Sequence, residues 1–150
     1  MKKDRPKRKK RWGWLIPVGI LGLLIVFALG MLIVDTPNRR EIAEMEIGQI
    51  DFSSLNDGTY TGSYIGTKGH MRDVTLTVTI ENGIITDISI PDEALDEEGN
   101  PAELGEGVTA IGYLTRAAAA QSLGIDAVSG ATLTSKTLLK ALENALEQAQ

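Results

Sequence analysis

One unbroken apolar stretch near the N-terminus constrains this chain more than any other feature. Trp14–Val34 runs for 21 residues without a charged side chain. About 20 apolar residues in a helix cover the roughly 30 Å of a bilayer's hydrocarbon core, so a transmembrane helix is predicted over residues 12–34. Residues 2–11 carry a net charge of +7 and residues 35–150 a net charge of −12. The positive-inside rule then predicts a single-pass protein of the cell membrane, with a cytoplasmic N-terminus and an extracytoplasmic body.

The same stretch has two other interpretations. A buried helix of a soluble protein would need partner surfaces on every side, and a body of this size is too small to supply them. A cleaved signal peptide is the closer rival, because the stretch is N-terminal and follows a basic flank. Four apolar residues, 31–34, follow the small residues of Ala28–Gly30 at which cleavage would occur, and the apolar run is long for a signal peptide. An uncleaved anchor is therefore favoured.

The basic flank, residues 1–11, indicates a lipid surface as a partner. A run of Lys and Arg can form a nucleic-acid patch. Beside a membrane span, however, such a run is explained more simply as a topology signal that also contacts anionic lipid. The sequence thus predicts contact with the lipid bilayer and no nucleic-acid partner.

Composition excludes several classes of site. The 150 residues allow one ordinary domain and a short appendage. The absence of cysteine excludes disulfides, Cys-ligated metals and a thiol nucleophile. The single histidine, His70, leaves no multi-His metal site and no histidine-led triad within one chain. We therefore assign neither metal ligands nor catalytic residues.

Residues 35–54 are predicted to form a tether to a domain over residues 55–150. Thr36-Pro37-Asn38 is expected to break the preceding helix, because proline disfavours helical backbone at the residue before it. The second half of the tether contains apolar side chains that indicate docking on a core. A flexible tether of about 20 residues has a root-mean-square reach near 25 Å.

Three antiparallel strands are predicted at the start of the domain. Thr59–Ile65 is rich in Thr and Tyr, and residues 74–80 alternate apolar side chains with threonine. Asn82-Gly83 is a strong signal for a tight hairpin turn. The return strand, residues 84–90, is expected to place Ile84, Thr86, Ile88 and Ile90 on one face.

Two helices follow an acidic loop, residues 91–107. The first is predicted over residues 108–123, ended by Gly124, and the second over residues 136–148, each with an apolar stripe at helical spacing. The predicted fold class is α+β, with a small antiparallel sheet packed against two helices.

Two glycine motifs precede these helices. Residues 105–110, G-E-G-V-T-A, loosely match the G-x-G-x-x-A fingerprint of dinucleotide-binding proteins. They follow an acidic loop and not a hydrophobic strand, so they are interpreted as a helix start.

The second motif is D-A-V-S-G-A-T-L-T-S, residues 126–135. A plain interpretation is a turn followed by an N-cap at Thr134 or Ser135. The alternative is an anion site, because free N–H groups and the helix dipole favour a phosphate at a helix start. Gly130 would allow the backbone to approach such a ligand closely.

Asp126–Thr132 also resembles the D-x-x-[ST]-G-A-T pattern of FMN-binding domains. That family includes the C subunit of sodium-pumping NADH:quinone reductase, the G subunit of Rnf complexes and small membrane-bound relatives. Residues 57–62, the hairpin that ends at residues 82–87 and Gln121-Ser122 are similar to family features as well. The resemblance covers roughly residues 55–148.

The resemblance implies that FMN is held covalently by a phosphoester bond to Thr132, which a flavin transferase adds. Ser129, Gly130 and Ala131 would shape the acceptor loop, and Asp126 would help the transferase to recognise it. The isoalloxazine ring is expected across the sheet or near the loop Gly66–Arg72, where His70 is a candidate contact. The further cofactor-binding residues implied by the motif are Thr134 and Ser135.

By this resemblance, the chain is expected to be a membrane-anchored, extracytoplasmic flavoprotein that relays electrons from a membrane donor to an extracytoplasmic or membrane acceptor. An electron-transfer carrier, or a subunit of an oxidoreductase complex, is favoured over a stand-alone enzyme. Two alternatives remain open: a non-redox interaction module of the same fold, and a flavin-dependent reductase of a small acceptor or quinone. The loop Asp92–Glu106 is unusually acidic for the family, which leaves the identity of the partner open.

Overall fold

The structure is a computed structural model that describes residues 15–150, with side chains for residues 16–30 and 36–150. The predicted basic flank, residues 1–11, lies outside the described residues. The chain divides into two compact units, Met1–Thr36 and Pro37–Gln150. We describe each unit by itself.

Helix α1 (Leu15–Glu44) begins in the first unit. Its large apolar side chains from Ile16 to Leu29 are each more than half exposed. Within the described part of the chain, no helix combines the length and the apolar character needed to cross a membrane. The transmembrane helix over residues 12–34 stays a prediction.

The expected break at Thr36-Pro37-Asn38 is wrong, because Pro37 lies inside α1 and the helix continues to Glu44. A proline removes only one backbone donor, and tertiary packing can hold the helix beyond it. Here Asn38 and Ile42 belong to the second unit and are buried within it. The docking predicted for the later part of this segment is confirmed by the burial of Phe52 and Leu55.

The sheet contains β1 (Gly58–Tyr64), β2 (Val74–Glu81) and β3 (Ile84–Ser89), antiparallel and in that order. The predicted alternation in β2 is confirmed, because Leu76, Val78 and Ile80 are buried. Asn82 and Gly83 form the predicted tight turn, and both have positive φ, 55° and 72°.

The predicted facing of β3 is wrong at its first residues. Thr79 pairs with Asp87, but Ile80 pairs with Ile85, so Thr86 is an extra residue in the ladder. One inserted residue reverses which side chains face the core, since successive side chains alternate. Ile88 is therefore buried as predicted, while Ile84 is 62% exposed.

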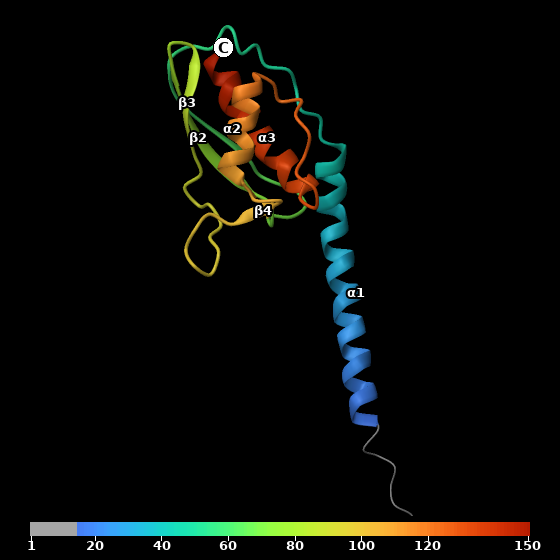
Figure 1. Ribbon diagram of the computed structural model, residues 1–150. Coiled ribbons are helices and arrows are strands. Elements are labelled where there is room, and N and C mark those ends of the chain that lie inside the picture. Colours follow the sequence, from blue (N-terminus) through green and yellow to red (C-terminus); the bar gives the residue numbers. More distant parts are fainter. Residues whose placement is uncertain (1–14) are drawn as a thin grey trace, which may run out of the picture. The chain divides into compact units, whose positions relative to one another are not determined.

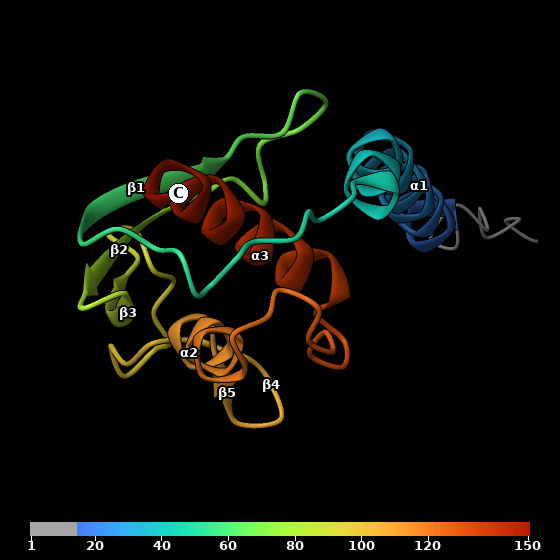
Figure 2. The same cartoon turned by 90° about the horizontal axis from the view of Figure 1, so that it is seen from above.

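Two helices cover one face of this sheet, as predicted for an α+β fold (Figures 1 and 2). Helix α3 (Thr132–Leu146) packs on β1 and β2, and α2 (Ala110–Ala120) packs on β3 and α3. The one-turn helix η2 (Glu147–Ala149) follows α3. Gly62 of β1 allows the close approach of α3, because a Cβ there would collide with the backbone of Ala141 and Ala145.

The acidic loop contains a short antiparallel pair, β4 (Glu103–Gly105) and β5 (Val108–Thr109). This pairing is the reason that α2 begins at Ala110, two residues later than predicted. The helix ends at Ala120, and the left-handed backbone of its C-cap Gln121 (φ 48°) closes it before Gly124, the predicted terminator.

Candidate functional site

The second glycine motif forms a tight turn that leads directly into α3. The Ala131 N–H donates to the Val128 carbonyl at 3.0 Å. Gly130 has φ +80°, a value that suits glycine at the third position of such a turn. Thr132 follows as the first residue of α3, four residues before the predicted helix start. We call Val128–Ala131 the acceptor turn.

The predicted N-cap at Thr134 or Ser135 is wrong. Ala131 occupies the cap position, and no side chain there bonds to the helix. Ser135 lies inside the helix, and its Oγ accepts a hydrogen bond from the Val128 N–H at 3.1 Å. The first N–H groups of a helix have no intrahelical partner. The start of α3 therefore presents N–H groups that no side-chain cap satisfies among the described residues.

The surface of the acceptor turn is open. Ser129, Gly130 and Thr132 are exposed, and so is Asp126. A Cβ at Gly130 would meet no atom within 4 Å. An exposed hydroxyl at the uncapped start of a helix is a favourable place for a phosphate, because the helix dipole and free N–H groups stabilise negative charge. These residues fit a phosphate-bearing cofactor.

The β4–β5 pair packs beside the acceptor turn. A Cβ at Gly105 would lie 3.0 Å from the Ser129 carbonyl oxygen and 3.5 Å from Val128 Cγ1. The interpretation of residues 105–110 as a helix start is confirmed, since Thr109 Oγ1 caps α2 by accepting from the Gly112 N–H at 3.1 Å. The contact between Gly105 and Ser129 could not be predicted from sequence, because it depends on how the acidic loop folds back.

His70 lies on a different loop from the acceptor turn. Its Nδ1 is 2.8 Å from Asp73 Oδ2, and Asp73 Oδ1 accepts from the Gly66 N–H at 2.9 Å. Desolvation opposes ionisation of Asp73, but the hydrogen bonds from Gly66 and His70 outweigh it and hold the pKa of this carboxyl below its usual value. His70 is thus engaged within its own loop, with 71% of its side chain exposed. Among the described contacts, none brings it to the acceptor turn.

No sequence pattern indicates that residues of α1 hold this same loop. The Glu41 carboxylate accepts hydrogen bonds from the Thr67 N–H (3.0 Å), the Thr67 hydroxyl (2.9 Å) and the Lys68 N–H (3.1 Å). The Thr67 N–H contributes most to lowering the pKa of Glu41. Helix α1 therefore fixes the loop in which a flavin ring was predicted.

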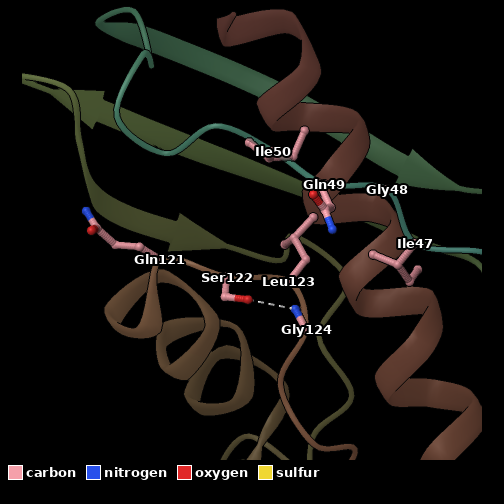
Figure 3. Close-up of a pocket in the computed structure, with 8 residues that line it drawn as sticks. All are labelled: Ile47, Gly48, Gln49, Ile50, Gln121, Ser122, Leu123 and Gly124. Atoms are coloured by element: carbon pink, nitrogen blue, oxygen red, sulfur yellow. Dashed lines mark hydrogen bonds between the residues drawn. The ribbon is translucent and has the colours of Figure 1, made fainter.

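The acceptor turn does not line either of two hollows on the surface of the described residues. One of about 370 Å³ lies between Ile47–Ile50 and Gln121–Gly124, where Ser122 Oγ accepts from the Gly124 N–H at 3.0 Å (Figure 3). The other, of about 210 Å³, is lined by Phe52, Leu55, Gly83, Ile84, Ile85, Thr115, Ala118, Ala119 and Gln121. The described residues contain no group of His, Cys, Asp and Glu suited to a metal ion.

Comparison with known proteins places this geometry in context. Residues 69–147 match the family model described as FMN-binding domain. The chain is also 33% identical over 98 residues to an uncharacterized protein of Treponema pallidum (strain Nichols), a match that covers 65% of this chain. The chain spans about a quarter of that protein's length, since the match covers 25% of it. No solved structure matches the chain.

Proposed function

Because this chain belongs to the FMN-binding domain family, we propose that it carries FMN covalently on Thr132 and relays electrons in a membrane-associated chain. The observation that supports the attachment most directly is the position of Thr132. Its side chain is exposed, it is the first residue of α3, and no side chain caps the helix there.

The attachment is a phosphoester bond. A bond forms between Thr132 Oγ1 and the flavin phosphorus as the phosphoanhydride bond of an activated flavin nucleotide, supplied with the flavin transferase, breaks. The departing phosphate group takes up the proton of the Thr132 hydroxyl. The N–H groups of α3 lie at the same end of the helix and stabilise the remaining phosphate charge. Ser129 and Gly130 keep the surface open around Thr132, and exposed Asp126 is available to the transferase. Bound FMN supplies one- and two-electron redox chemistry that protein side chains lack.

An open surface favours a carrier over a reductase. Ser129, Gly130 and Thr132 are exposed, and the acceptor turn lines neither of the two hollows described above. A cofactor held there is accessible to partner proteins, which suits transfer of electrons between a membrane donor and a second acceptor. A reductase of a small molecule would need a concave binding site for that substrate beside the cofactor.

Membrane anchoring is part of the same proposal. It is supported by the 21-residue uncharged run of Trp14–Val34 and by the exposed apolar side chains from Ile16 to Leu29. The difference in charge between residues 2–11 and 35–150 supports an extracytoplasmic domain. Protease added to right-side-out vesicles should digest residues 37–150. Protection of these residues would contradict the topology.

The attachment is tested by producing the full chain together with an active flavin transferase. Wild-type protein should fluoresce on a denaturing gel, and its intact mass should exceed that of the polypeptide by FMN less one water. Thr132→Ala should fold and show neither signal, because it removes the acceptor oxygen from an exposed position.

Thr134→Ala is the matched control. Thr134 is two residues further along α3, and its side chain forms no cap, so this variant should keep both signals. If Thr132→Ala retains covalent flavin, the assignment of the acceptor is wrong. If the wild type carries none, the proposed function fails.

A further inference from the structure

Ser135 is a buried polar residue beneath the acceptor turn. Its side chain is fully buried, with 0% exposure, and Val128 is 6% exposed. The Val128 N–H donates to Ser135 Oγ at 3.1 Å in this buried environment. Buried N–H groups are nearly always paired, and leaving one unpaired is costly. The Ser135 hydroxyl is the partner that the structure provides for this N–H.

Three hydrogen bonds form a closed ring, one within the acceptor turn and two between the turn and Ser135 of α3. Val128 donates its N–H to Ser135 Oγ, and Ala131 donates its N–H to the Val128 carbonyl at 3.0 Å. The Ser135 N–H donates to the Ala131 carbonyl at 2.8 Å, which is the first bond of the helix. Thr132 lies inside this ring in sequence, so its backbone is fixed from both sides.

Ser135 Oγ is the one hydrogen-bond partner that the described residues give the Val128 N–H. Tyr113, from α2, is 1% exposed, and its hydroxyl has no hydrogen-bond partner among the described atoms. Burial, followed by the charge of Asp126, raises the pKa of this hydroxyl, while the nearby Ser135 hydroxyl opposes the rise. Gly105, of the β4–β5 pair, lies close to the Ser129 carbonyl oxygen. Neither neighbour forms a described hydrogen bond to Val128.

We infer that Ser135 is a positioning residue for covalent flavin attachment. This inference rests on the proposed function. By binding the Val128 N–H, Ser135 holds the acceptor turn against α3 and keeps Thr132 as the exposed first residue of the helix. Ser135 does not itself contact the flavin phosphate, since its hydroxyl is buried and occupied. The motif's final serine thus acts from beneath the site and not as a cofactor ligand.

The test compares the rate of flavin attachment in variants that keep Thr132. Full-length Ser135→Ala in detergent micelles, incubated with flavin transferase well below its unfolding temperature, should acquire covalent FMN about tenfold more slowly than wild type or slower still. Ser135→Thr keeps a hydroxyl on the same carbon and should recover most of the rate.

Thr137→Val is the control for stability. Thr137 is also buried, at 1% exposure, and its hydroxyl donates at 2.9 Å to the Thr134 carbonyl within α3. This variant also removes a buried hydroxyl from α3, but its acceptor turn is intact, so it should acquire FMN at the wild-type rate. An equal slowing of both variants would show that general destabilisation is responsible and would overturn the inference.

A second readout needs no flavin. In unmodified protein, hydrogen exchange at the Val128 amide should be slow, and Ser135→Ala should accelerate it far more than exchange at other amides of α3. Unchanged exchange, or an unchanged rate of attachment in folded Ser135→Ala, would overturn the inference. The proposed function fails by a different result, namely wild-type protein without covalent FMN or with FMN on another residue.

Discussion

The two helices that pack on the sheet begin in contrasting ways. Both follow a glycine with positive φ, Gly107 (73°) before α2 and Gly130 (80°) before α3. At α2, Thr109 caps the helix with its own hydroxyl. At α3, the cap position is occupied by Ala131, which has no polar side chain, and the nearby buried hydroxyl of Ser135 binds the turn instead. At the start of α2, the Thr109 side chain binds a free N–H group of the helix. At the start of α3, no side-chain cap does so, and the N–H groups are available to a ligand.

The comparison shows that a hydroxyl near a glycine does not by itself identify a helix cap. In both segments a threonine follows the glycine at a distance of two residues. Thr109 precedes its helix and caps it, while Thr132 is already inside its helix and exposed. A residue outside the helix can cap it, but the first residue inside offers its side chain to solvent or to a ligand.

The largest effect on stability should come from replacing either of the two glycines, Gly107 or Gly130, with alanine. Gly130→Ala and Gly107→Ala meet no neighbouring atom within 4 Å, so each should cost only the strain of a left-handed backbone, about 1–2 kcal/mol. Thermal unfolding should show similar losses for both. Only Gly130→Ala should also slow the attachment of FMN. Equal flavin loading in the two variants would show that the two helix starts do not differ in their effect on FMN attachment.

Removing the cap of α2 should have a somewhat smaller effect. Thr109→Ala leaves the Gly112 N–H without its partner and should lower the free energy of unfolding by about 1 kcal/mol. Chemical denaturation measures this loss, and flavin loading should be unchanged. The matched substitution in α3, Thr134→Ala, should cost much less, because Thr134 forms no cap. Comparable losses would mean that both helix starts are capped in solution.

Adding a side-chain cap to α3 should have the opposite effect on stability. Ala131→Asp places a carboxylate at the cap position and should stabilise the unmodified chain by about 0.5–1 kcal/mol. The same carboxylate would accept hydrogen bonds from the free N–H groups of α3 and repel a phosphate, so FMN should attach more slowly. A more stable variant that loads at the wild-type rate would show that these N–H groups do not assist attachment.

The smallest effect should come from Tyr113, a buried residue in the first turn of α2. Tyr113→Phe removes a buried hydroxyl that has no partner and should change stability near pH 8 by only a few tenths of a kcal/mol, as when unmatched polar groups are removed. Burial raises the pKa of Tyr113 above its ordinary value of 10. The unfolded chain then releases the proton first, so wild-type stability falls as the pH rises above about 10.

The Phe variant should therefore gain stability relative to wild type between pH 8 and pH 11. Denaturation at both pH values tests this expectation. A constant difference between the two proteins would mean that Tyr113 ionises as easily in the folded chain as in the unfolded one.

The sequence was sufficient for features that depend on local pattern. Alternation in residues 74–80 predicted β2, and Asn82-Gly83 predicted the hairpin. Together with the motif around Gly130, these patterns predicted the α+β fold and the FMN-binding family. Each depends on residues close together in the chain, so one sequence contains the whole signal.

Features set by distant residues were not predicted correctly. Pro37 stays inside α1 because Asn38 and Ile42 pack on the domain, and Ile84 turns outward because Thr86 is an extra residue in the ladder. The N-cap predicted at Ser135 is also wrong. As a chemical group the Ser135 hydroxyl could cap a helix, and only the folded position of Val128 determines which N–H it binds. Whether Thr132 bears FMN stays a prediction.

The amino group of Lys136 links the end of α1 to the start of α3. Its Nζ donates to the carbonyl oxygens of Ala43 and Met45, both at 2.7 Å, and Lys136 lies one helical turn after Thr132. A mechanical pull on residues 37–44 would therefore be transmitted through this side chain to the helical turn that contains Thr132. Tension on residues 37–44 would thus act at the proposed site of flavin attachment itself.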